Sequence, residues 1–414
     1  MLLMATGKRV NDILLITISG EDRSGLTAAI TAVLAKQDVN ILDIGQAVIH
    51  DTLSMGVLVE VPGGASHESV VGAVENCVAG VGLSVRSNSI SPQSYSHWVE
   101  GQGRARYIIT LLARKITADQ LAQVTGVVAK HGLNIDSVNR LSGRIPLGEL
   151  PALSKACVEF SVRGALTDSA LFRAELLEVA GALEVDLAFQ QDNMYRRNRR
   201  LVVFDMDSTL IEAEVIDELA KAAGVGQQVA QITEGAMRGE LDFAESFRNR
   251  VALLKGLKET ALSDIASELK ISEGAEHLIS TLRLLGYKTA ILSGGFSYFA
   301  RHLQAKLGID HVYANELDIV DGVVSGQVVG DIVDGARKAS LLRQLASEEG
   351  IDLQQVIAVG DGANDLPMLS IAGLGVAFRA KPLVKKSAEQ SISTLGLDAI
   401  LYLLGIGDRD QNNG

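Results

Sequence analysis

From Arg200 onward, short apolar segments alternate with helical segments, and this alternation constrains the fold more than any other feature of the chain. Four apolar segments are candidate parallel strands: Leu201–Phe204, Lys288–Leu292, Val356–Val359 and Leu374–Ala377. Helical segments separate them, as parallel strands in one sheet require. The sequence therefore predicts a doubly wound α/β domain built on a parallel sheet.

The segment between the first two predicted strands is helical and long. It runs from about Glu214 to Lys270 without a clear strand, which exceeds the length that a plain crossover needs. We therefore expect a helical cap over about residues 214–272, inserted at the edge of the sheet and able to act as a lid. Farther along, Val312–Val333 alternates and is punctuated by Gly and Asp, which predicts hairpin strands.

The front half of the chain contains a weak two-copy repeat. Ile16–Ile18, a helical pattern and Ala35–Ile41 recur as Ile109–Leu111, a helical pattern and Ala129–Ile135. Because only two copies exist, we interpret them as a tandem pair of domains and not as a solenoid.

Each copy of the repeat continues in the same order. A second extended segment, a helix and a last strand follow, at Met55–Val61 and Leu83–Ser87 in the first copy and at Lys155–Val162 and Leu183–Phe189 in the second. The order strand, helix, strand, strand, helix, strand predicts a split βαβ, ferredoxin-like domain. We place the two copies at residues 10–92 and 104–192, ahead of the α/β domain at residues 200–405.

Charge and cysteine content restrict the class of protein. A net charge of −12 argues against nucleic acid or an anionic membrane as the main partner. The two cysteines, Cys77 and Cys157, are too few for a disulfide framework or a thiolate metal site and suit a reducing cytoplasm. Apolar runs stay short of the ~18 residues that span a membrane. We therefore expect a soluble, cytoplasmic protein.

One basic cluster, Arg196–Arg200, precedes the α/β domain and contains four arginines. We interpret it as a solvated linker. A functional contact with an anion is the alternative interpretation.

Polar residues follow three of the predicted strands, at the point where each strand ends. They are Asp205 and Asp207 after the first strand, Ser293-Gly294-Gly295 after the second, and Gly360-Asp361-Gly362-Ala363-Asn364-Asp365 after the third. Ligands of doubly wound sheets bind beyond the carboxyl ends of the strands, so we expect these groups around one pocket. Lys338, near the start of a helix predicted over Ala339–Ala346, is expected to join them.

The charge of such a pocket predicts its ligands. Two unit charges ~4 Å apart interact with about 4 kcal/mol at an effective dielectric of 20, so several carboxylates would repel one another and any anion. An oxygen-rich cluster of this kind suits Mg²⁺. With Mg²⁺ and Lys338 in place, the pocket could hold a phosphate dianion, with Ser293 and the Gly294 and Gly295 backbone donating to its oxygens.

The combined motifs resemble those of a known family. The sequences D-x-D-x-T, S-G-G, a lysine and G-D-x-x-N-D are similar to the four motifs of the haloacid dehalogenase superfamily of phosphatases, and they stand here at Asp205–Thr209, Ser293–Gly295, Lys338 and Gly360–Asp365. Glu212–Glu214 and Phe247–Val251 resemble the subfamily that hydrolyses O-phospho-L-serine, the last step of serine biosynthesis. The resemblance covers about Arg200–Gly405.

The resemblance implies a chemical role for each matching acidic residue. Asp205 would be the nucleophile that forms an aspartyl-phosphate. Asp207 would be the general acid that protonates the leaving serine oxygen, and then the base that activates water. Mg²⁺ would be held by Asp205, the Asp207 carbonyl oxygen and Asp361.

The same resemblance implies how the substrate is held. Ser293, Gly294, Lys338 and Asn364 would bind the transferring phosphoryl group. Glu214 and Arg250 would bind the amino and carboxylate groups of phosphoserine. Met237 and Phe243 would line the lid, although positions in the core suit them equally well.

The front half resembles ACT domains. Gly20–Leu26, between a strand and a helix, is similar to the amino-acid-binding turn of that family, which implies that Asp22 and Gly25 bind an effector such as serine. Arg114–Asp119 in the second copy departs from this pattern, and Asp119 falls where the first copy has Gly25. ACT domains often pair across subunits, which implies a homodimer.

Two other functions remain open at this point. The phosphatase site could serve another small phosphomonoester. Alternatively, the chain could be an amino-acid sensor whose phosphatase-like half is catalytically silent. The presence of Asp205, Asp207, Lys338 and Asp361 favours an enzyme. Asp207 also favours a phosphatase over a dehalogenase, whose reaction leaves no alkoxide to protonate.

Overall fold

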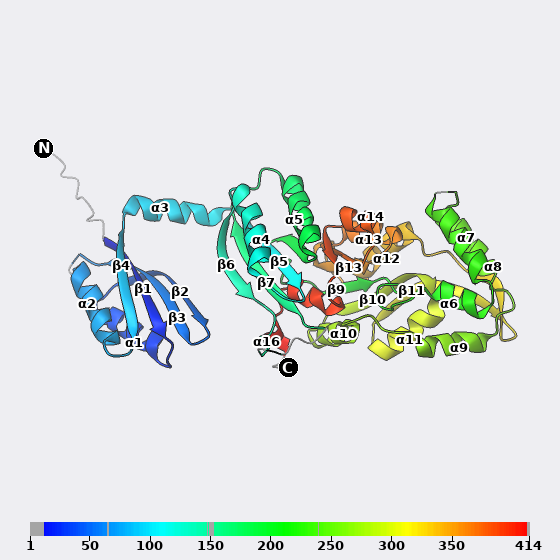
Figure 1. Ribbon diagram of the computed structural model, residues 1–414, viewed down its shortest axis with the longest axis horizontal. Coiled ribbons are helices and arrows are strands. Elements are labelled where there is room, and N and C mark those ends of the chain that lie inside the picture. Colours follow the sequence, from blue (N-terminus) through cyan, green and yellow to red (C-terminus); the bar gives the residue numbers. More distant parts are fainter. Residues whose placement is uncertain (1–11, 64–65, 147, 149–152, 239, 412–414) are drawn as a thin grey trace. The chain divides into compact units, whose positions relative to one another are not determined.

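The computed structural model describes residues 12–63, 66–146, 148, 153–238 and 240–411, without the side chain of Met237. The chain divides into two compact units, residues 1–104 and 105–414 (Figure 1). The predicted start of the first domain at residue 10 lies outside the described residues. Within the described part of the chain, no helix combines the length and apolar character that crossing a bilayer requires.

The first unit is a four-stranded antiparallel sheet with two helices on one face. Its elements are β1 (Asp12–Glu21), α1 (Leu26–Lys36), β2 (Asn40–Ile49), β3 (Thr52–Val61), α2 (His67–Val78) and β4 (Leu83–Ile90), followed by α3 (Pro92–Glu100) and η1 (Gly101–Gly103). The strand order is β2-β3-β1-β4. Alternate residues of β1, including Leu14, Ile16 and Ile18, are buried in a core shared with both helices. This is the split βαβ fold predicted from the repeat.

The second unit begins with the second copy of the same fold. Its elements are β5 (Arg106–Ala113), α4 (Ala118–Lys130), β6 (Asn134–Arg140), β7 (Ala156–Arg163), α5 (Ser169–Leu183) and β8 (Asp186–Gln191), and its strand order is β6-β7-β5-β8. The predicted last strand began too early, because Leu183 is the final residue of α5. Glu184 then ends the helix in a left-handed conformation with φ 52°.

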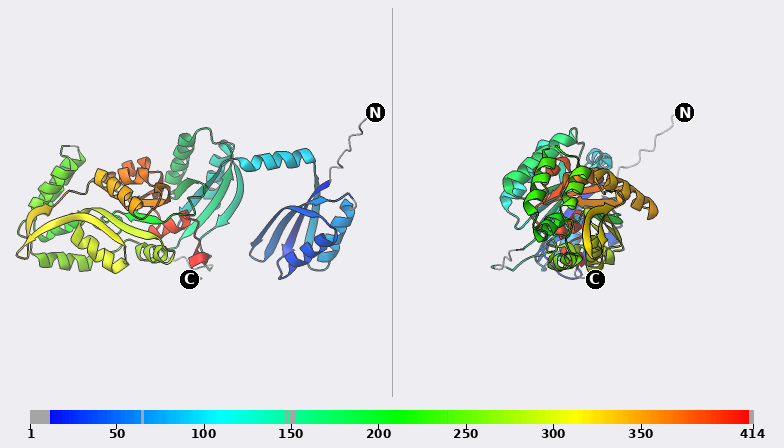
Figure 2. Two further views of the ribbon diagram at one scale, coloured as in Figure 1. Left: turned by 180° about the vertical axis from the view of Figure 1, so that it is seen from behind. Right: turned by 90° about the vertical axis from the view of Figure 1, so that its right-hand side faces the viewer.

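The rest of the second unit is built on a seven-stranded sheet of order β12-β11-β10-β9-β13-β14-β15 (Figures 1 and 2). The strands are β9 (Leu201–Phe204), β10 (Lys288–Phe296), β11 (His311–Val320), β12 (Val323–Val329), β13 (Val356–Gly360), β14 (Leu374–Phe378) and β15 (Gln390–Ile392). All pairings are parallel except that of β11 with β12. The predicted parallel strands and the predicted hairpin are both present.

Helices cover both faces of this sheet. The elements are α10 (Ala275–Leu284), α11 (Ser297–Leu307), α12 (Gly335–Glu348), η2 (Leu353–Gln355), η3 (Ala363–Asp365), α13 (Leu366–Ile371), α14 (Pro382–Ser387), η4 (Leu397–Ala399), α15 (Ile400–Leu403) and α16 (Asp408–Gln411). In β9, Val202 and Phe204 belong to the core with α10 and α11, while Leu201 and Val203 belong to the core with α12 and α13. A strand that is apolar on both sides therefore lies between two helical layers, as a doubly wound fold requires.

The cap is a group of four helices between β9 and β10. They are α6 (Val215–Ala222), α7 (Gly226–Met237), α8 (Phe243–Ala252) and α9 (Glu259–Glu268). The chain enters and leaves the cap through two segments that pair with each other. Ile211 bridges Ile271 in antiparallel fashion, and the Glu212 N–H donates to the Lys270 carbonyl at 2.9 Å.

The prediction that the arginine cluster before β9 is a solvated linker was wrong for two of its four arginines, Arg196 and Arg199, whereas Arg197 and Arg200 are exposed. Arg196 is 1% exposed and pairs with Glu159 of β7, and the buried Arg199 donates to the Gln354 carbonyl of η2. A guanidinium can be buried when a carboxylate or carbonyl accepts from it. Arg196 and Arg199 therefore attach this segment to the second ferredoxin-like domain and to the sheet domain.

A side chain also joins the edges of the two sheets in this unit. Gln390 of β15 accepts from the Phe189 N–H of β8 at 2.8 Å and donates to the Phe189 carbonyl at 2.6 Å. Beside it, the Asp186 carboxylate accepts from the Ser393 and Thr394 N–H groups at 2.9 and 2.7 Å. The β8 edge is thereby covered by the sheet domain.

Candidate active site

The candidate site lies at the point where the strand order of the parallel sheet reverses. β9 pairs with β10 on one side and with β13 on the other, so the carboxyl ends of these three strands meet. The Asp205 N–H donates to the Val359 carbonyl at 2.8 Å, which holds the end of β9 against β13. The three predicted groups of polar residues therefore do converge, as the strand-end argument required.

Lys338 lies between two carboxylates. Its Nζ is 2.7 Å from Asp205 Oδ1 and 2.6 Å from Asp365 Oδ1, and its side chain is fully buried. Burial opposes the charged amine, but the two carboxylates outweigh it and raise the pKa of Lys338. The lysine is therefore a fixed positive charge at the centre of the site.

The helix that carries Lys338 begins earlier than predicted. α12 starts at Gly335, and the Asp334 side chain caps it by accepting from the Arg337 N–H at 2.8 Å. Lys338 is therefore within the first turn, where its backbone is fixed by the cap. Asp is a preferred residue at this position, so the sequence did contain the signal.

Three carboxylates of the site could share a cation. Asp205, Asp361 and Asp365 each offer an oxygen within 4.8 Å of the others, and all three are buried. Burial and the neighbouring Asp365 raise the pKa of Asp205 well above its usual range, and burial raises the pKa of Asp361 to about 7. Such shifts express the cost of clustered negative charge, which a divalent cation would relieve. The donor set is all oxygen and fits Mg²⁺.

The metal ligands predicted from sequence differ from this trio at one position. Asp365 was not among them, although it ends the G-D-x-x-N-D motif. Its carboxylate accepts from Lys338 and, through Oδ2, from the Gly362 N–H at 2.9 Å. The predicted contact through the Asp207 carbonyl oxygen stays a prediction.

The surroundings of Asp207 shift its pKa in the direction that the predicted general acid requires. Burial, together with the nearby Glu214 carboxylate, raises the pKa of Asp207 to about 8. Its Oδ1 accepts from the Val215 N–H at 3.2 Å, at the start of α6. On the other side, a Cβ at Gly295 would overlap Asp207 Oδ2. The carboxyl group is thus held by backbone on two sides, and its raised pKa favours the protonated form.

The Ser293-Gly294-Gly295 turn is fixed from behind. The buried Ser293 Oγ accepts from the Gly295 N–H at 2.9 Å. Asn315, which is 2% exposed, donates to the Gly294 carbonyl at 2.8 Å and accepts from the Val333 N–H at 2.8 Å. Asn315 therefore ties the turn after β10 to the segment that leads into α12. Nothing in the sequence indicated this residue.

A cap helix forms one wall of the pocket. Phe243, Ser246, Phe247 and Arg250 of α8 lie three, four and seven residues apart, and all four line a cavity of about 640 Å³ that also contacts Asp205, Asp207 and Asn364. The rings of Phe243 and Phe247 are nearly parallel, and a Cβ at Gly294 would lie 3.1 Å from Phe243. Phe243 therefore reaches the Ser293-Gly294-Gly295 turn. The Met237 side chain lies outside the described residues.

The two residues predicted to read the substrate face the same pocket from different elements. Glu214 stands before α6, and Ser208 Oγ donates to its Oε1 at 2.8 Å. Burial lowers the pKa of Arg250, although Glu214 opposes that shift. Arg250 Nε donates to the Ser246 carbonyl at 3.3 Å. One anionic and one cationic group thus line the same cavity.

The predicted effector turn of the first unit has the expected backbone. Gly25 precedes α1 with φ 90°, a left-handed conformation that favours glycine. In the second copy the residue that precedes the helix is Thr117, whose side chain forms a capping box with Gln120. When the two copies are aligned on the sequence repeat, α4 begins two residues before the position that matches the start of α1. Thr117, and not Asp119, is therefore the structural counterpart of Gly25.

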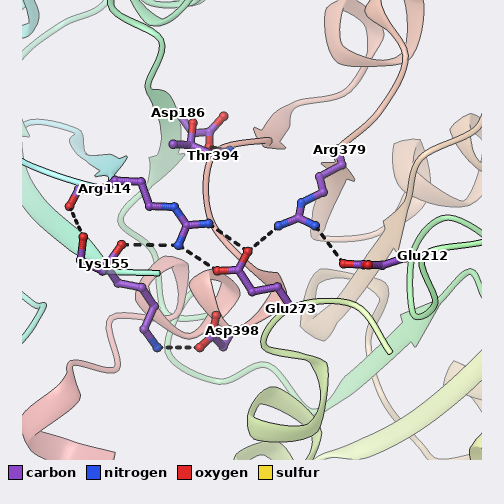
Figure 3. Close-up of polar contacts among 9 residues, drawn as sticks. Arg114, Lys155, Asp186, Glu212, Glu273, Arg379, Thr394 and Asp398 are labelled. Atoms are coloured by element: carbon purple, nitrogen blue, oxygen red, sulfur yellow. Dashed lines mark hydrogen bonds and ion pairs between the residues drawn. The ribbon is translucent and has the colours of Figure 1, made fainter. Parts of the chain in front are cut away.

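The second copy uses this turn to contact the sheet domain (Figure 3). Arg114 donates to both oxygens of Glu273 at 2.8 and 2.9 Å. Arg379, after β14, donates to Glu273 at 2.6 Å and lies 3.7 Å from Glu212. Lys155 pairs with Asp398 at 2.6 Å. A row of alternating charges thus connects the second ferredoxin-like domain to the chain segments that enter and leave the cap.

Comparison with known proteins agrees with this architecture. Residues 199–373 match the haloacid dehalogenase-like hydrolase family, and residues 12–86 and 105–190 match ACT domains. The chain is 43% identical over 404 residues to a phosphoserine phosphatase of Mycobacterium tuberculosis, covering 95% of this chain and 93% of that protein. It is 41% identical over 393 residues to a phosphoserine phosphatase of Streptomyces coelicolor, covering 95% and 92%.

A solved structure is similar as well. The crystal structure of a probable phosphoserine phosphatase from Vibrio cholerae, in an unliganded form, superimposes with a TM-score of 0.58 at 35% identity. The match covers 75% of this chain and 90% of that chain.

Proposed function

Because the chain belongs to the phosphoserine phosphatases, a family of haloacid dehalogenase-like hydrolases preceded here by two ACT domains, we propose that it hydrolyses O-phospho-L-serine through an aspartyl-phosphate, with Mg²⁺. The observation that carries the proposal is the fully buried Lys338 between Asp205 and Asp365. Burying one lysine and two carboxylates so close together costs free energy, and such clusters are typical of sites that bind a charged ligand.

Two chemical steps account for the reaction. Asp205 attacks phosphorus while the bond from phosphorus to the serine oxygen breaks, and Asp207 gives its proton to that oxygen. Asp207 then takes a proton from water, whose oxygen attacks phosphorus and releases Asp205 and phosphate. The raised pKa of Asp207 supports both of its roles. Bound Mg²⁺, held by Asp205, Asp361 and Asp365 with the Asp207 carbonyl, would neutralise phosphoryl charge.

Substrate binding divides between the sheet domain and the cap. Ser293, the Gly294 backbone, Lys338 and Asn364 hold the phosphoryl group, which lies deep in the pocket. Glu214 binds the ammonium group and Arg250 binds the carboxylate. This division is supported by the opposite charges of Glu214 and Arg250 in one cavity.

A phosphate-release assay with a panel of small phosphomonoesters, with Mg²⁺ and with chelator, tests the proposal. We expect phosphoserine to be the best substrate and turnover to need Mg²⁺. Asp205→Asn should abolish release while circular dichroism stays unchanged. A different best substrate would favour the other small-phosphomonoester phosphatase, and wild-type turnover by Asp205→Asn would contradict the nucleophile.

The substrate-reading role of Arg250 has its own test. Arg250→Ala should reduce kcat/KM for phosphoserine far more than for an aromatic phosphomonoester, because only phosphoserine has a carboxylate to bind. Equal losses on both substrates would contradict the assignment.

We further propose that serine regulates the enzyme at the first ACT domain. The left-handed Gly25 beside Asp22 supports a binding turn there, whereas the corresponding turn of the second copy is occupied by its contact with Glu273. Calorimetry on Arg250→Ala, which weakens the catalytic site, should still detect serine binding. Adding Asp22→Ala should remove it, and the absence of any serine site in Arg250→Ala would contradict the proposal.

A homodimer is also proposed. β2 is an edge strand of the first unit, and its exposed apolar side chains are Ile41, Ile44, Val48 and Ile49. An exposed apolar edge strand is suited to pairing with a second copy. Light scattering should report a dimer, and Ile44→Lys should shift it towards monomer. The cytoplasmic location stays a prediction.

A further inference from the structure

Ser246 shares its helix face with two parts of the substrate pocket. It lies three residues after Phe243 and four before Arg250 on α8, and residues at these spacings are neighbours on one face of a helix. All three line the same cavity. The serine is therefore placed one helical turn from the guanidinium group that faces the pocket.

The Ser246 hydroxyl lacks a partner. The side chain is 1% exposed, and Oγ has no hydrogen-bond partner among the described residues. The Asp242 carbonyl accepts the Ser246 N–H at 3.0 Å, but the Ser246 hydroxyl makes no bond to that carbonyl. Leaving a buried hydroxyl unpaired costs free energy. A pocket-lining hydroxyl in this condition indicates a group that a ligand satisfies.

The charge of Arg250 indicates which group of a ligand would accept a hydrogen bond from the Ser246 hydroxyl. Arg250 attracts an anionic group to this side of the cavity, and its Nε is bonded to the Ser246 carbonyl at 3.3 Å. A carboxylate beside the guanidinium has lone pairs left to accept from a hydroxyl. The Glu214 carboxylate and its Ser208 donor belong to a different element and would serve the ammonium group.

We infer that Ser246 donates a hydrogen bond to the carboxylate of phosphoserine and is a specificity-determining residue beside Arg250. The inference rests on the proposed function, because it assigns the contact to that substrate. The carboxylate is remote from phosphorus and is bound in the same way in ground and transition states. Loss of the contact therefore raises KM and leaves kcat nearly unchanged.

Ser246→Ala tests the inference with two ligands. O-Phosphoethanolamine keeps the phosphate and the amine of phosphoserine but has no carboxylate. We expect the KM for phosphoserine to rise about tenfold, the loss typical of a hydrogen bond to a charged group. The inhibition constant of O-phosphoethanolamine against phosphoserine should stay within about twofold of the wild-type value, because that ligand never made the contact.

Stability measurements separate this role from a structural one. Because the hydroxyl has no partner in the free protein, Ser246→Ala should not lower the melting temperature. Ser267→Ala is the matched control on cap helix α9, since Ser267 Oγ donates to the Asp264 carbonyl at 2.7 Å. The control should leave both ligands unaffected.

Three outcomes would overturn the inference. They are an unchanged KM for phosphoserine, an equal loss on both ligands, or a lowered melting temperature that accompanies the loss. If the wild-type enzyme releases no phosphate from phosphoserine, the proposed function fails and the inference falls with it. If the wild-type enzyme is active on phosphoserine, the three outcomes above contradict only the inference about Ser246.

Discussion

Ser208 holds Glu214 from a backbone conformation that serine rarely adopts. Its Oγ donates to Glu214 Oε1 at 2.8 Å, and its φ is 55°. A left-handed residue other than glycine costs about 1 kcal/mol or more. Strain of this kind persists where the rest of the site requires it, and here it aims a hydroxyl at the residue proposed to bind the substrate ammonium group.

Removing this hydroxyl should weaken recognition of the amine. We expect Ser208→Ala to raise the KM for phosphoserine several-fold, with little effect on phosphoglycolate, which has a carboxylate but no amine. Ser208→Gly should show the same kinetic loss with higher stability, because glycine relieves the strained φ. Steady-state kinetics and thermal melts check both statements. A Ser208→Gly enzyme with wild-type KM would show that the bond to Glu214 has no role in recognition.

Asn315 should act as a positioning residue. Its amide holds the Gly294 carbonyl and the Val333 N–H, both at 2.8 Å. Asn315→Ala leaves two buried backbone groups unpaired, which costs about 1–3 kcal/mol for each. We expect lower stability and a kcat reduced at least about tenfold, because the turn that we propose to bind the phosphoryl group loses its support.

Asn315→Asp provides the finer comparison. It keeps the acceptor for the Val333 N–H but loses the donor to Gly294, so its stability should lie between those of wild type and Asn315→Ala. Asn139→Ala, at an exposed position on β6, is the control and should match wild type. Full activity of Asn315→Ala would contradict the positioning role.

Lys338 should be essential for stability as well as for activity. Lys338→Met leaves Asp205 and Asp365 buried without their cation, and breaking a buried pair in this way costs about 3–5 kcal/mol. Urea unfolding in chelator should show this loss. Lys338→Met with Asp365→Asn should recover part of the stability but no activity, since the phosphoryl group still lacks its lysine. Equal stability of Lys338→Met and wild type would contradict the account.

The sequence predicted the site residues that directly follow strands better than the residues that other elements bring to the site. Asp205 and Asp361 follow apolar strands directly, and parallel strands end at one edge, so their convergence follows from topology alone. Asn315 and Ser246 gave no signal, because their importance depends on which backbone group or cavity the tertiary fold brings to them. Arg196 was misread for the same reason, since its carboxylate partner, Glu159, comes from another domain.

Metal binding should stabilise the folded protein. The carboxylates of Asp205, Asp361 and Asp365 repel one another, and a bound cation offsets that repulsion. A ligand at one hundred times its Kd stabilises by about 2.7 kcal/mol. We therefore expect the melting temperature to rise with Mg²⁺, and Asp361→Asn to shift this rise to higher Mg²⁺ concentrations. A melting temperature independent of Mg²⁺ would exclude a cation at this trio.

The contact between the second ACT domain and the sheet domain should depend more on Glu273 than on either arginine. Glu273 accepts from Arg114 through both oxygens and from Arg379 through one. Both arginines lower the pKa of Glu273, and Arg379 also lies 3.7 Å from Glu212. Arg114→Ala should cost about 1 kcal/mol, the range of a partly exposed ion pair.

Glu273→Gln should cost more than Arg114→Ala, because it weakens both pairs and leaves two guanidinium groups close together. A double-mutant cycle on urea unfolding, with Arg114→Ala and Glu273→Gln, should give a coupling energy of about 0.5–1 kcal/mol. Lys115→Ala, at the exposed neighbouring position, is the control and should leave stability unchanged. Additive effects of Arg114→Ala and Glu273→Gln would show that the pair contributes nothing to docking, and would leave the attachment of the two domains to their other contacts, among them Gln390, Asp186 and the Lys155–Asp398 pair.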